Sequence, residues 1–169
     1  MKRKWKIVDK SGENKENLGI TRQLNYMFIG EYQHSIDEKG RMAVPSKMRR
    51  DLGSGAVVTR GIDNCLWVFP KKEWQALAEK LASLPLTDTN SRAFSRLMLA
   101  GAMEVEFDSQ GRALLPGYLR IYAGLRKNAV IAGLFNRLEI WDQTRWQEYK
   151  EKTEKATDQI AKHMADLGV

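Results

Sequence analysis

Hydrophobic and polar positions alternate over several short segments of this chain, and in longer segments hydrophobic positions recur every three to four residues. Alternation predicts strands, and the longer spacing predicts helices. Turn-forming Gly, Asn and Asp residues separate the expected strands. These strands lie at residues 32–36, 41–44, 56–59, 65–69, 105–107, 129–132 and 138–141. Together with the helices below, they indicate an α+β fold.

Two short helices are bracketed by proline and glycine. Pro45 and Gly53 enclose residues 46–52, and Pro116 and Gly124 enclose residues 117–123. Proline near the first turn and glycine past the last turn are typical of helix ends. Three longer helices are also expected. The first has a hydrophobic face made of Trp74, Leu77, Ala78, Leu81 and Leu84, and the second is capped by Asp88 and carries Phe94, Leu97 and Met98. The third is a single C-terminal helix that starts after Asp142 and carries Trp146, Tyr149, Ile160 and Met164. We expect these aromatic stripes to pack and not to bind a cofactor.

The chain contains an internal duplication. The turn Asp37–Arg41, followed by Pro45, recurs 71 residues later as Asp108–Arg112, followed by Pro116. After one inserted residue the match continues, and Trp74 corresponds to Trp146. Two copies are too few for a solenoid but suit a pseudo-symmetric pair. The expected organisation is a basic extension over 1–26, a first unit over 31–78, a helical connector over 79–104, a second unit over 105–150 and a C-terminal helix over 151–169.

The duplicated turns have a specific expected geometry. An aspartate at the start can accept hydrogen bonds from its own backbone two residues later, and a glycine can adopt a positive φ. Asp37 and Gly40 supply these roles in the first copy, and Asp108 and Gly111 supply them in the second. We therefore expect each aspartate–glycine pair to position the arginine that follows.

Composition excludes several classes of protein. The 169 residues are 43% hydrophobic and 29% charged, which is typical of a globular protein, and no run is apolar enough for a membrane span. The single cysteine, Cys65, cannot form an internal disulfide and fits a reducing cytosol; it is either a buried hydrophobe, which we favour, or a reactive thiol. His34 and His163 are far apart, so no metal site is expected.

The net charge of +7 is unevenly distributed. Residues 1–26 hold seven basic and three acidic residues, so the remaining chain has a net charge of only +3. Residues 1–26 are polar and indicate disorder unless they form a structured element. Three interpretations stay open: an extension that results from an upstream start, a native basic arm that binds phosphates, or a structured segment.

Catalytic motifs are absent from the sequence. There is no phosphate-binding loop, no HExxH motif, no nucleophile elbow and no paired cysteine. Asp37 and Asp108 could form an acid–base pair, but each precedes an arginine in a turn, so turn capping or ion pairing explains them better. We expect no enzyme activity and no cofactor.

From Met27 onward the chain resembles the MraZ family of bacterial transcriptional regulators, which are built from two AbrB-like swapped-hairpin units. The resemblance rests on His34–Arg41 with Pro45, and on Asp108–Arg112 with Pro116, and it covers residues 27–169. It implies a single barrel of two intertwined ββαββ units and a ring-shaped homo-oligomer. It also implies binding to repeated DNA boxes upstream of a cell-division and cell-wall gene cluster that includes the family's own gene, and a cytoplasmic, nucleoid-associated location.

The resemblance implies that Arg41 and Arg112 face DNA, where an arginine fork can read guanine or clamp phosphate. The alternative is that both arginines serve only in intramolecular ion pairs. The candidate phosphate contacts, whose alternative is a solvated helix face, are Lys39, Lys47, Arg49, Arg50 and Arg120.

Sequence-specific binding of double-stranded promoter DNA is thus the favoured function. The alternative from another class is a protein-interaction scaffold or an antitoxin-like module that binds a partner protein.

Overall fold

The computed structural model describes residues 27–168, so the leader 1–26 and its three interpretations lie outside the described residues. The first half contains β1 (Phe28–Ser35), β2 (Arg41–Ala43), α1 (Ser46–Leu52), β3 (Gly55–Arg60), a 3₁₀ turn (Ile62–Asn64) and β4 (Leu66–Pro70). The second half contains β5 (Met103–Glu106), β6 (Arg112–Leu114), α4 (Gly117–Ala123), β7 (Asn128–Phe135) and β8 (Arg137–Asp142). Both halves therefore follow the order ββαββ, which confirms the duplication and the mixed α+β fold.

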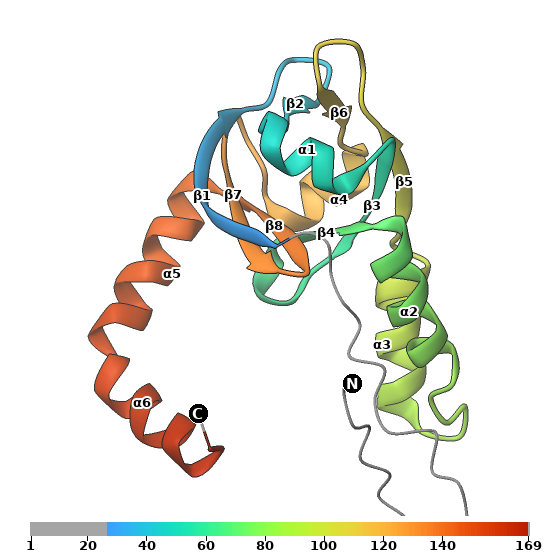
Figure 1. Ribbon diagram of the computed structural model, residues 1–169. Coiled ribbons are helices and arrows are strands. Elements are labelled where there is room, and N and C mark those ends of the chain that lie inside the picture. The colour runs from blue at the N-terminus through green and yellow to red at the C-terminus, as the bar shows by residue number, and fades with distance from the viewer. Residues whose placement is uncertain (1–26, 169) are drawn as a thin grey trace, which may run out of the picture.

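The two halves exchange strands within one antiparallel sheet (Figure 1). The sheet order is β1-β7-β8-β4-β3-β5. Strand β1 of the first half pairs with β7 of the second, with Tyr32 opposite Ile131, and β5 of the second half pairs with β3 of the first, with Val57 opposite Glu104. Neither half could therefore form its sheet without the other.

The short strands β2 and β6 form a separate two-stranded ribbon. Single bridges join this ribbon to the residues that directly follow β1 and β5, from Met42 to Ile36 and from Ala113 to Phe107. Among the described residues, the hydrogen-bonded strands form an open sheet and a ribbon, not one closed barrel.

The space between the ribbon, the sheet and helices α1 and α4 holds one hydrophobic core with contributions from both halves. Met42 and Ala113 point into it from the ribbon, and both are buried. Met48 and Leu119 enter from the two short helices, and Ile131 enters from the sheet. Since burying one such side chain stabilises the folded state by about 1.5–3 kcal/mol, this shared core ties the halves together.

The short helices have the predicted bounds, because their ends have the expected chemistry. Pro45 and Pro116 precede them with φ near −50°, which is compatible with a helix start. Gly53 and Gly124 follow with φ of 78° and 62°, a region that glycine adopts without strain.

The connector helices α2 (Lys71–Ala82) and α3 (Thr89–Leu99) lie at the end of the molecule opposite the ribbon (Figure 1). The predicted cap is confirmed, because the carboxylate of Asp88 accepts a hydrogen bond of 2.6 Å from the backbone N–H of Ser91. Trp74 packs against Phe69 of β4, with ring centroids 6.1 Å apart. The connector is therefore anchored to the sheet through an aromatic contact.

The prediction of a single C-terminal helix is wrong, because the structure has two: α5 (Gln143–Lys155) and α6 (Thr157–Asp166). The threonines at the break hydrogen-bond to helix carbonyls through their hydroxyls, Thr153 to Tyr149 and Thr157 to Thr153 and Glu154. Such bonds bend or weaken helices. Trp146 and Tyr149 of α5 pack against Trp141 in tilted orientations, whereas Ile160 of α6 is exposed. Packing is thus confined to one end of this segment.

Candidate nucleic-acid interface

The turn between β1 and β2 is built around Asp37. Its Oδ1 accepts hydrogen bonds from the backbone N–H groups of Lys39 (3.0 Å) and Arg41 (2.9 Å). Gly40 completes the turn with a φ of 81°, where a side chain would be strained. The predicted turn chemistry is therefore confirmed in the first half.

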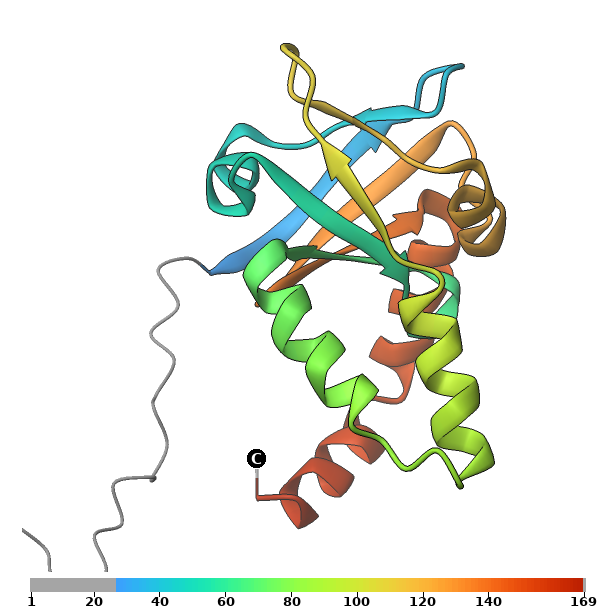
Figure 2. The ribbon, with the colours of Figure 1, turned by 90° about the vertical axis from the view of Figure 1, so that its right-hand side faces the viewer.

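The turn between β5 and β6 repeats this arrangement. Asp108 Oδ1 accepts hydrogen bonds of 2.9 Å from the backbone N–H groups of Gln110 and Arg112, and Gly111 has a φ of 75°. The two turns project side by side from the same end of the molecule (Figures 1 and 2). Strand exchange and the ribbon thus bring together two motifs that are 71 residues apart in the sequence.

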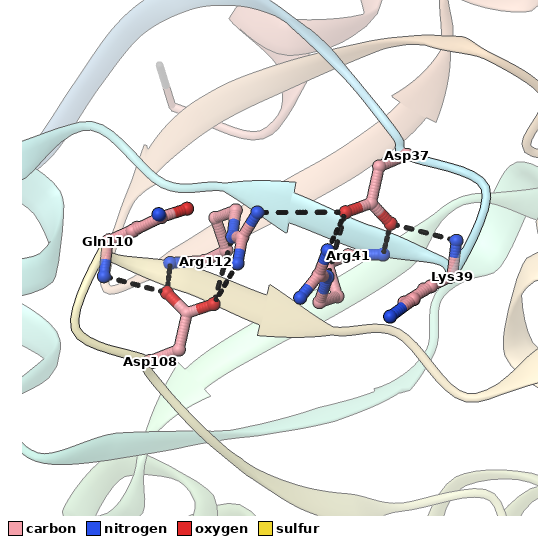
Figure 3. Close-up of polar contacts among 6 residues, drawn as sticks. All are labelled: Asp37, Lys39, Arg41, Asp108, Gln110 and Arg112. Carbon is pink, nitrogen blue, oxygen red and sulfur yellow. Dashed lines mark hydrogen bonds and ion pairs between the residues drawn. The ribbon is translucent and has the colours of Figure 1, made fainter.

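The second carboxylate oxygen of each aspartate holds an arginine side chain (Figure 3). Asp37 Oδ2 lies 2.7 Å from both Nε and Nη2 of Arg41. Asp108 Oδ2 lies 2.8 Å from both Nε and Nη2 of Arg112. Each arginine therefore has its Nε edge fixed, while about a third of the side chain remains exposed: 32% for Arg41 and 27% for Arg112.

A longer ion pair connects the two turns. Nη1 of Arg112 lies 3.8 Å from Oδ2 of Asp37 (Figure 3). The backbone adds further links, because Val44 N–H donates to the carbonyl of Gly111 (3.1 Å) and Leu115 N–H donates to that of Gly40 (2.9 Å). Each turn is thus hydrogen-bonded to the segment that follows the other, and contacts between the halves hold the two turns together.

Both aspartates are held in the ionised form. The pKa of Asp37 is lowered, mainly by the hydrogen bond from the Arg41 backbone N–H and further by the Arg41 side chain. The pKa of Asp108 is lowered in the same way by Arg112. A carboxylate in this state is a poor general acid at neutral pH, so these groups suit positioning better than catalysis.

The helix arginines Arg49 and Arg120 do not extend freely into solvent. Nε of Arg49 donates to the carbonyl of Val44 (3.0 Å), and Nε of Arg120 donates to that of Leu115 (3.1 Å). The Arg49 guanidinium lies against Gly111 in the turn of the other half, and the Arg120 guanidinium lies against Gly40. Both arginines therefore support the turns, and contact with phosphate stays a prediction for them.

The remaining predicted contacts are exposed: Lys39 at a turn tip, and Lys47 and Arg50 on α1. The structure adds Arg126 and Lys127, which sequence reasoning missed. Both are exposed, and the carbonyl of Lys127 accepts a hydrogen bond of 2.8 Å from the N–H of Ile36, next to the first turn. In the sequence, these two basic residues follow Gly124, which ends α4. Only the pairing of β1 with β7 places them beside Asp37.

Positive charge is concentrated at the end of the molecule that carries the turns. Residues 36–54 and 107–128, which comprise the turns, the ribbon, α1, α4 and their flanking loops, hold nine basic and four acidic residues. Their net charge is +5, while that of residues 27–168 as a whole is +3. The rest of the described chain therefore has a slightly negative net charge. The positive charge around the turns would attract a polyanion to this end of the molecule.

Other candidate sites carry less chemistry. Cys65 is buried and bonds to the carbonyl of Ile62 (3.1 Å), which confirms the hydrophobic interpretation, and burial raises the pKa of its thiol. Between residues 27 and 168, no His, Cys, Asp and Glu side chains are grouped in a way that could hold a metal ion. No helix in that range is both long and apolar enough to cross a membrane.

Comparison with known proteins gives the family. The family model described as "MraZ protein, putative antitoxin-like" matches twice, over residues 27–97 and 98–167. Proteins named "Transcriptional regulator MraZ" match over 143 residues, which is 85% of this chain and 100% of each relative. They include those of Natranaerobius thermophilus (50% identical) and Pediococcus pentosaceus (49% identical). The chain therefore belongs to the MraZ family.

Proposed function

We propose that this protein is a transcriptional regulator that binds specific sequences in double-stranded DNA. The observation that carries the proposal is the pair of adjacent turns in which Asp37 holds Arg41 and Asp108 holds Arg112. Bonds from Nε and Nη2 to one carboxylate oxygen fix the orientation of each guanidinium, and a fixed guanidinium is what recognition of guanine O6 and N7 requires. The net charge of +5 at this end of the molecule supplies attraction to the phosphates.

The shape of the site supports binding in the major groove. A two-stranded ribbon fits a groove about 12 Å wide, and the ribbon β2–β6 carries both arginines. Exposed Lys39, Lys47 and Arg50 lie on the turn and on a flanking helix, where they would contact phosphates and fix the register. The arrangement thus separates base-reading residues from backbone-contacting ones.

The target we propose is a set of repeated boxes upstream of a cell-division and cell-wall gene cluster, including the protein's own promoter. The relatives' name, transcriptional regulator, supports the regulatory role. The described part of one chain offers two such arginines, so a ring-shaped homo-oligomer that contacts several boxes would gain affinity through effective concentration. We also interpret the exchanged strands as two swapped hairpins of the AbrB-like type, in a protein that acts in the cytoplasm at the nucleoid.

A second candidate is a module that binds a partner protein, in line with the antitoxin-like description of the family. One observation favours it: α4 exposes Tyr118 and Ile121 where the duplicated helix α1 exposes Lys47 and Arg50. Exposed apolar residues on one helix suit a protein surface better than a phosphate backbone.

A gel-shift titration with a fragment of the upstream region, repeated at several salt concentrations, tests the proposal. DNA binding predicts affinity that falls steeply with salt, with a log–log slope of about −0.9 for each phosphate neutralised. A shuffled fragment of the same length is the control for specificity. Equal affinity for both fragments, or no binding at low salt, would contradict the proposal and leave the protein-binding candidate.

A further inference from the structure

The outer face of the ribbon carries four side chains. Within β2 and β6, Met42 and Ala113 point inward and are buried, so their neighbours point outward. The ribbon register places Arg41 opposite Leu114 and Ala43 opposite Arg112. Side chains directly opposite one another in an antiparallel pair share a face, with Cβ atoms about 5 Å apart. Arg41 therefore has Leu114 beside it, and Arg112 has Ala43.

This face breaks the pseudo-symmetry of the duplication. Arg41 and Arg112 are equivalent positions, and so are Ala43 and Leu114, since each pair is separated by 71 residues. The turns and arginine bonds agree closely between the halves, but one arginine has a large apolar neighbour and the other has a methyl group. Leu114 is 56% exposed, so this side chain is not part of the core.

An exposed leucine beside a base-reading arginine has a specific complement in DNA. Thymine is the base that displays a methyl group in the major groove, and apolar side chains contact that methyl. Successive bases along a strand are about 3.4 Å apart, so two side chains with Cβ atoms about 5 Å apart can contact neighbouring bases. A guanine read by Arg41 would thus place a neighbouring thymine methyl within reach of Leu114.

We propose that Leu114 is a specificity-determining residue that contacts the 5-methyl group of a thymine next to the base read by Arg41. The proposal rests on the proposed function, because it requires the ribbon to lie in the major groove. Ala43 is too short to make the same contact beside Arg112. Each chain therefore reads an asymmetric sequence, with the thymine requirement on the Arg41 side only, and binds each box in one orientation.

The test replaces thymine by deoxyuridine, which removes only the methyl group. Two duplexes of the upstream region are compared, one with thymine and one with deoxyuridine at every thymine position. The unaltered protein should bind the deoxyuridine duplex about four-fold more weakly per contacted methyl, as expected from about 0.8 kcal/mol for one buried methyl-sized group. Leu114→Ala should bind both duplexes equally, with the weaker affinity.

Two further variants make the result specific. Leu86→Ala removes a leucine that is 79% exposed between α2 and α3, at the opposite end of the molecule, and should keep the full discrimination against deoxyuridine. Ala43→Leu adds the missing side chain beside Arg112 and should increase that discrimination. Single thymine replacements should then map the Leu114 contact to one position in each box.

Three outcomes would overturn the assignment. Equal binding of both duplexes by the unaltered protein would mean that no methyl is read. Retained discrimination in Leu114→Ala would place the methyl contact on another residue. A lower assembly mass in Leu114→Ala, with unchanged discrimination, would assign the leucine to contact between copies. Each outcome differs from failure of the proposed function, in which the unaltered protein would not prefer the upstream region at all.

Discussion

Arg120 lies so close to Gly40 that a Cβ atom added to the glycine would be 2.7 Å from Cζ of the arginine. Arg120 belongs to α4 in the second half, and Gly40 belongs to the turn of the first half. Arg49 of α1 and Gly111 form the reciprocal contact. Because each guanidinium also donates to a carbonyl in its own half, the helix of one half supports the turn of the other.

Gly40→Ala should therefore cost more stability than the backbone strain alone explains. The positive φ costs of order 1–3 kcal/mol for a residue with a side chain, and displacing Arg120 from its carbonyl should add about 1 kcal/mol. The matched comparison is the same substitution in an Arg120→Ala background, where the added Cβ meets no guanidinium. Urea unfolding should show a larger loss for Gly40→Ala in the unaltered protein than in that background.

A double variant checks the cause of that difference. In Arg120→Ala, the added methyl at position 40 no longer meets a guanidinium, so Gly40→Ala should then cost only the backbone strain. Additive losses for Gly40→Ala and Arg120→Ala would contradict a direct contact.

Acid should weaken the turns in a defined window. The pKa values of Asp37 and Asp108 are lowered below the ordinary value of 3.8, chiefly by hydrogen bonds from the backbone N–H groups of Arg41 and Arg112. A carboxyl group whose pKa is lowered by folding stabilises the folded state at pH values above its pKa in the unfolded chain. This stabilisation is lost as the pH falls through its pKa in the folded protein. Unfolding midpoints measured from about pH 5 to pH 2 should decline less steeply in Asp37→Asn and Asp108→Asn.

Asp88→Asn separates the effect of acid on stability from the effect of the carboxylate on DNA binding. Its pKa is also lowered, by the backbone N–H of Ser91 at the start of α3, far from the turns. This variant should flatten the acid decline in stability and leave DNA affinity at neutral pH unchanged, whereas Asp37→Asn should flatten that decline and also lower DNA affinity. Equal DNA affinity for Asp37→Asn and the unaltered protein would mean that the carboxylate does not position Arg41.

Local sequence patterns predicted the local structure of this site well. The turn chemistry of Asp37 and Gly40 depends on residues at most four positions apart, and so do the proline and glycine that bracket α1. Such features need no information about the rest of the chain. The duplication then extended each prediction from the first half to the second.

Contacts between the halves could not be predicted in the same way. Arg49 and Arg120 looked like surface cations on short helices, and only the ribbon register places each one against the glycine of the other half. Arg126 and Lys127 join the site through the β1–β7 pairing. The break at Ala156 depends on hydroxyl bonds of Thr153 and Thr157 that compete with the helix, which hydrophobic spacing does not report.

Assembly should raise the mass several-fold above the 19.4 kDa of one chain. Trp74 and Trp146 pack within the chain, whereas Ile121 on α4 is 82% exposed beside exposed Tyr118, so these two residues offer an apolar surface for association. Light scattering of the unaltered protein at micromolar concentration should report an oligomer, and Ile121→Glu should reduce its mass. A monomeric unaltered protein would contradict the ring and the multivalent mechanism.

Lys47 and Arg50 should contribute to affinity without reading sequence. Both are exposed on α1, the helix whose Arg49 lies against Gly111 of the second turn. Lys47→Ala and Arg50→Ala should each weaken specific and shuffled DNA alike, and each should flatten the salt dependence by about one unit of slope. Lys162→Ala on α6 removes an exposed lysine away from the turns and should change neither. An unchanged slope would assign Lys47 and Arg50 to a solvated helix face.

Arg41→Ala and Arg112→Ala should each abolish most specific binding while the fold stays intact. One lost base-reading arginine costs about 1–3 kcal/mol per contact, and an oligomer on several boxes would multiply that cost. Arg41→Lys and Arg112→Lys are the matched controls, because lysine keeps the charge but not the planar fork that Asp37 and Asp108 hold. The lysine variants should retain binding to shuffled DNA and lose the preference for the upstream region.

The ion-pair alternative predicts the opposite pattern for the same proteins. If Arg41 and Arg112 serve only their aspartates, the alanine variants should melt at lower temperature and still shift the upstream fragment. Circular dichroism melts beside gel shifts separate the two, since an exposed pair is worth about 1 kcal/mol or less. Normal shifts by a destabilised Arg41→Ala protein would remove that residue from the interface, and the Leu114 assignment would be lost with it because the two side chains face the same groove.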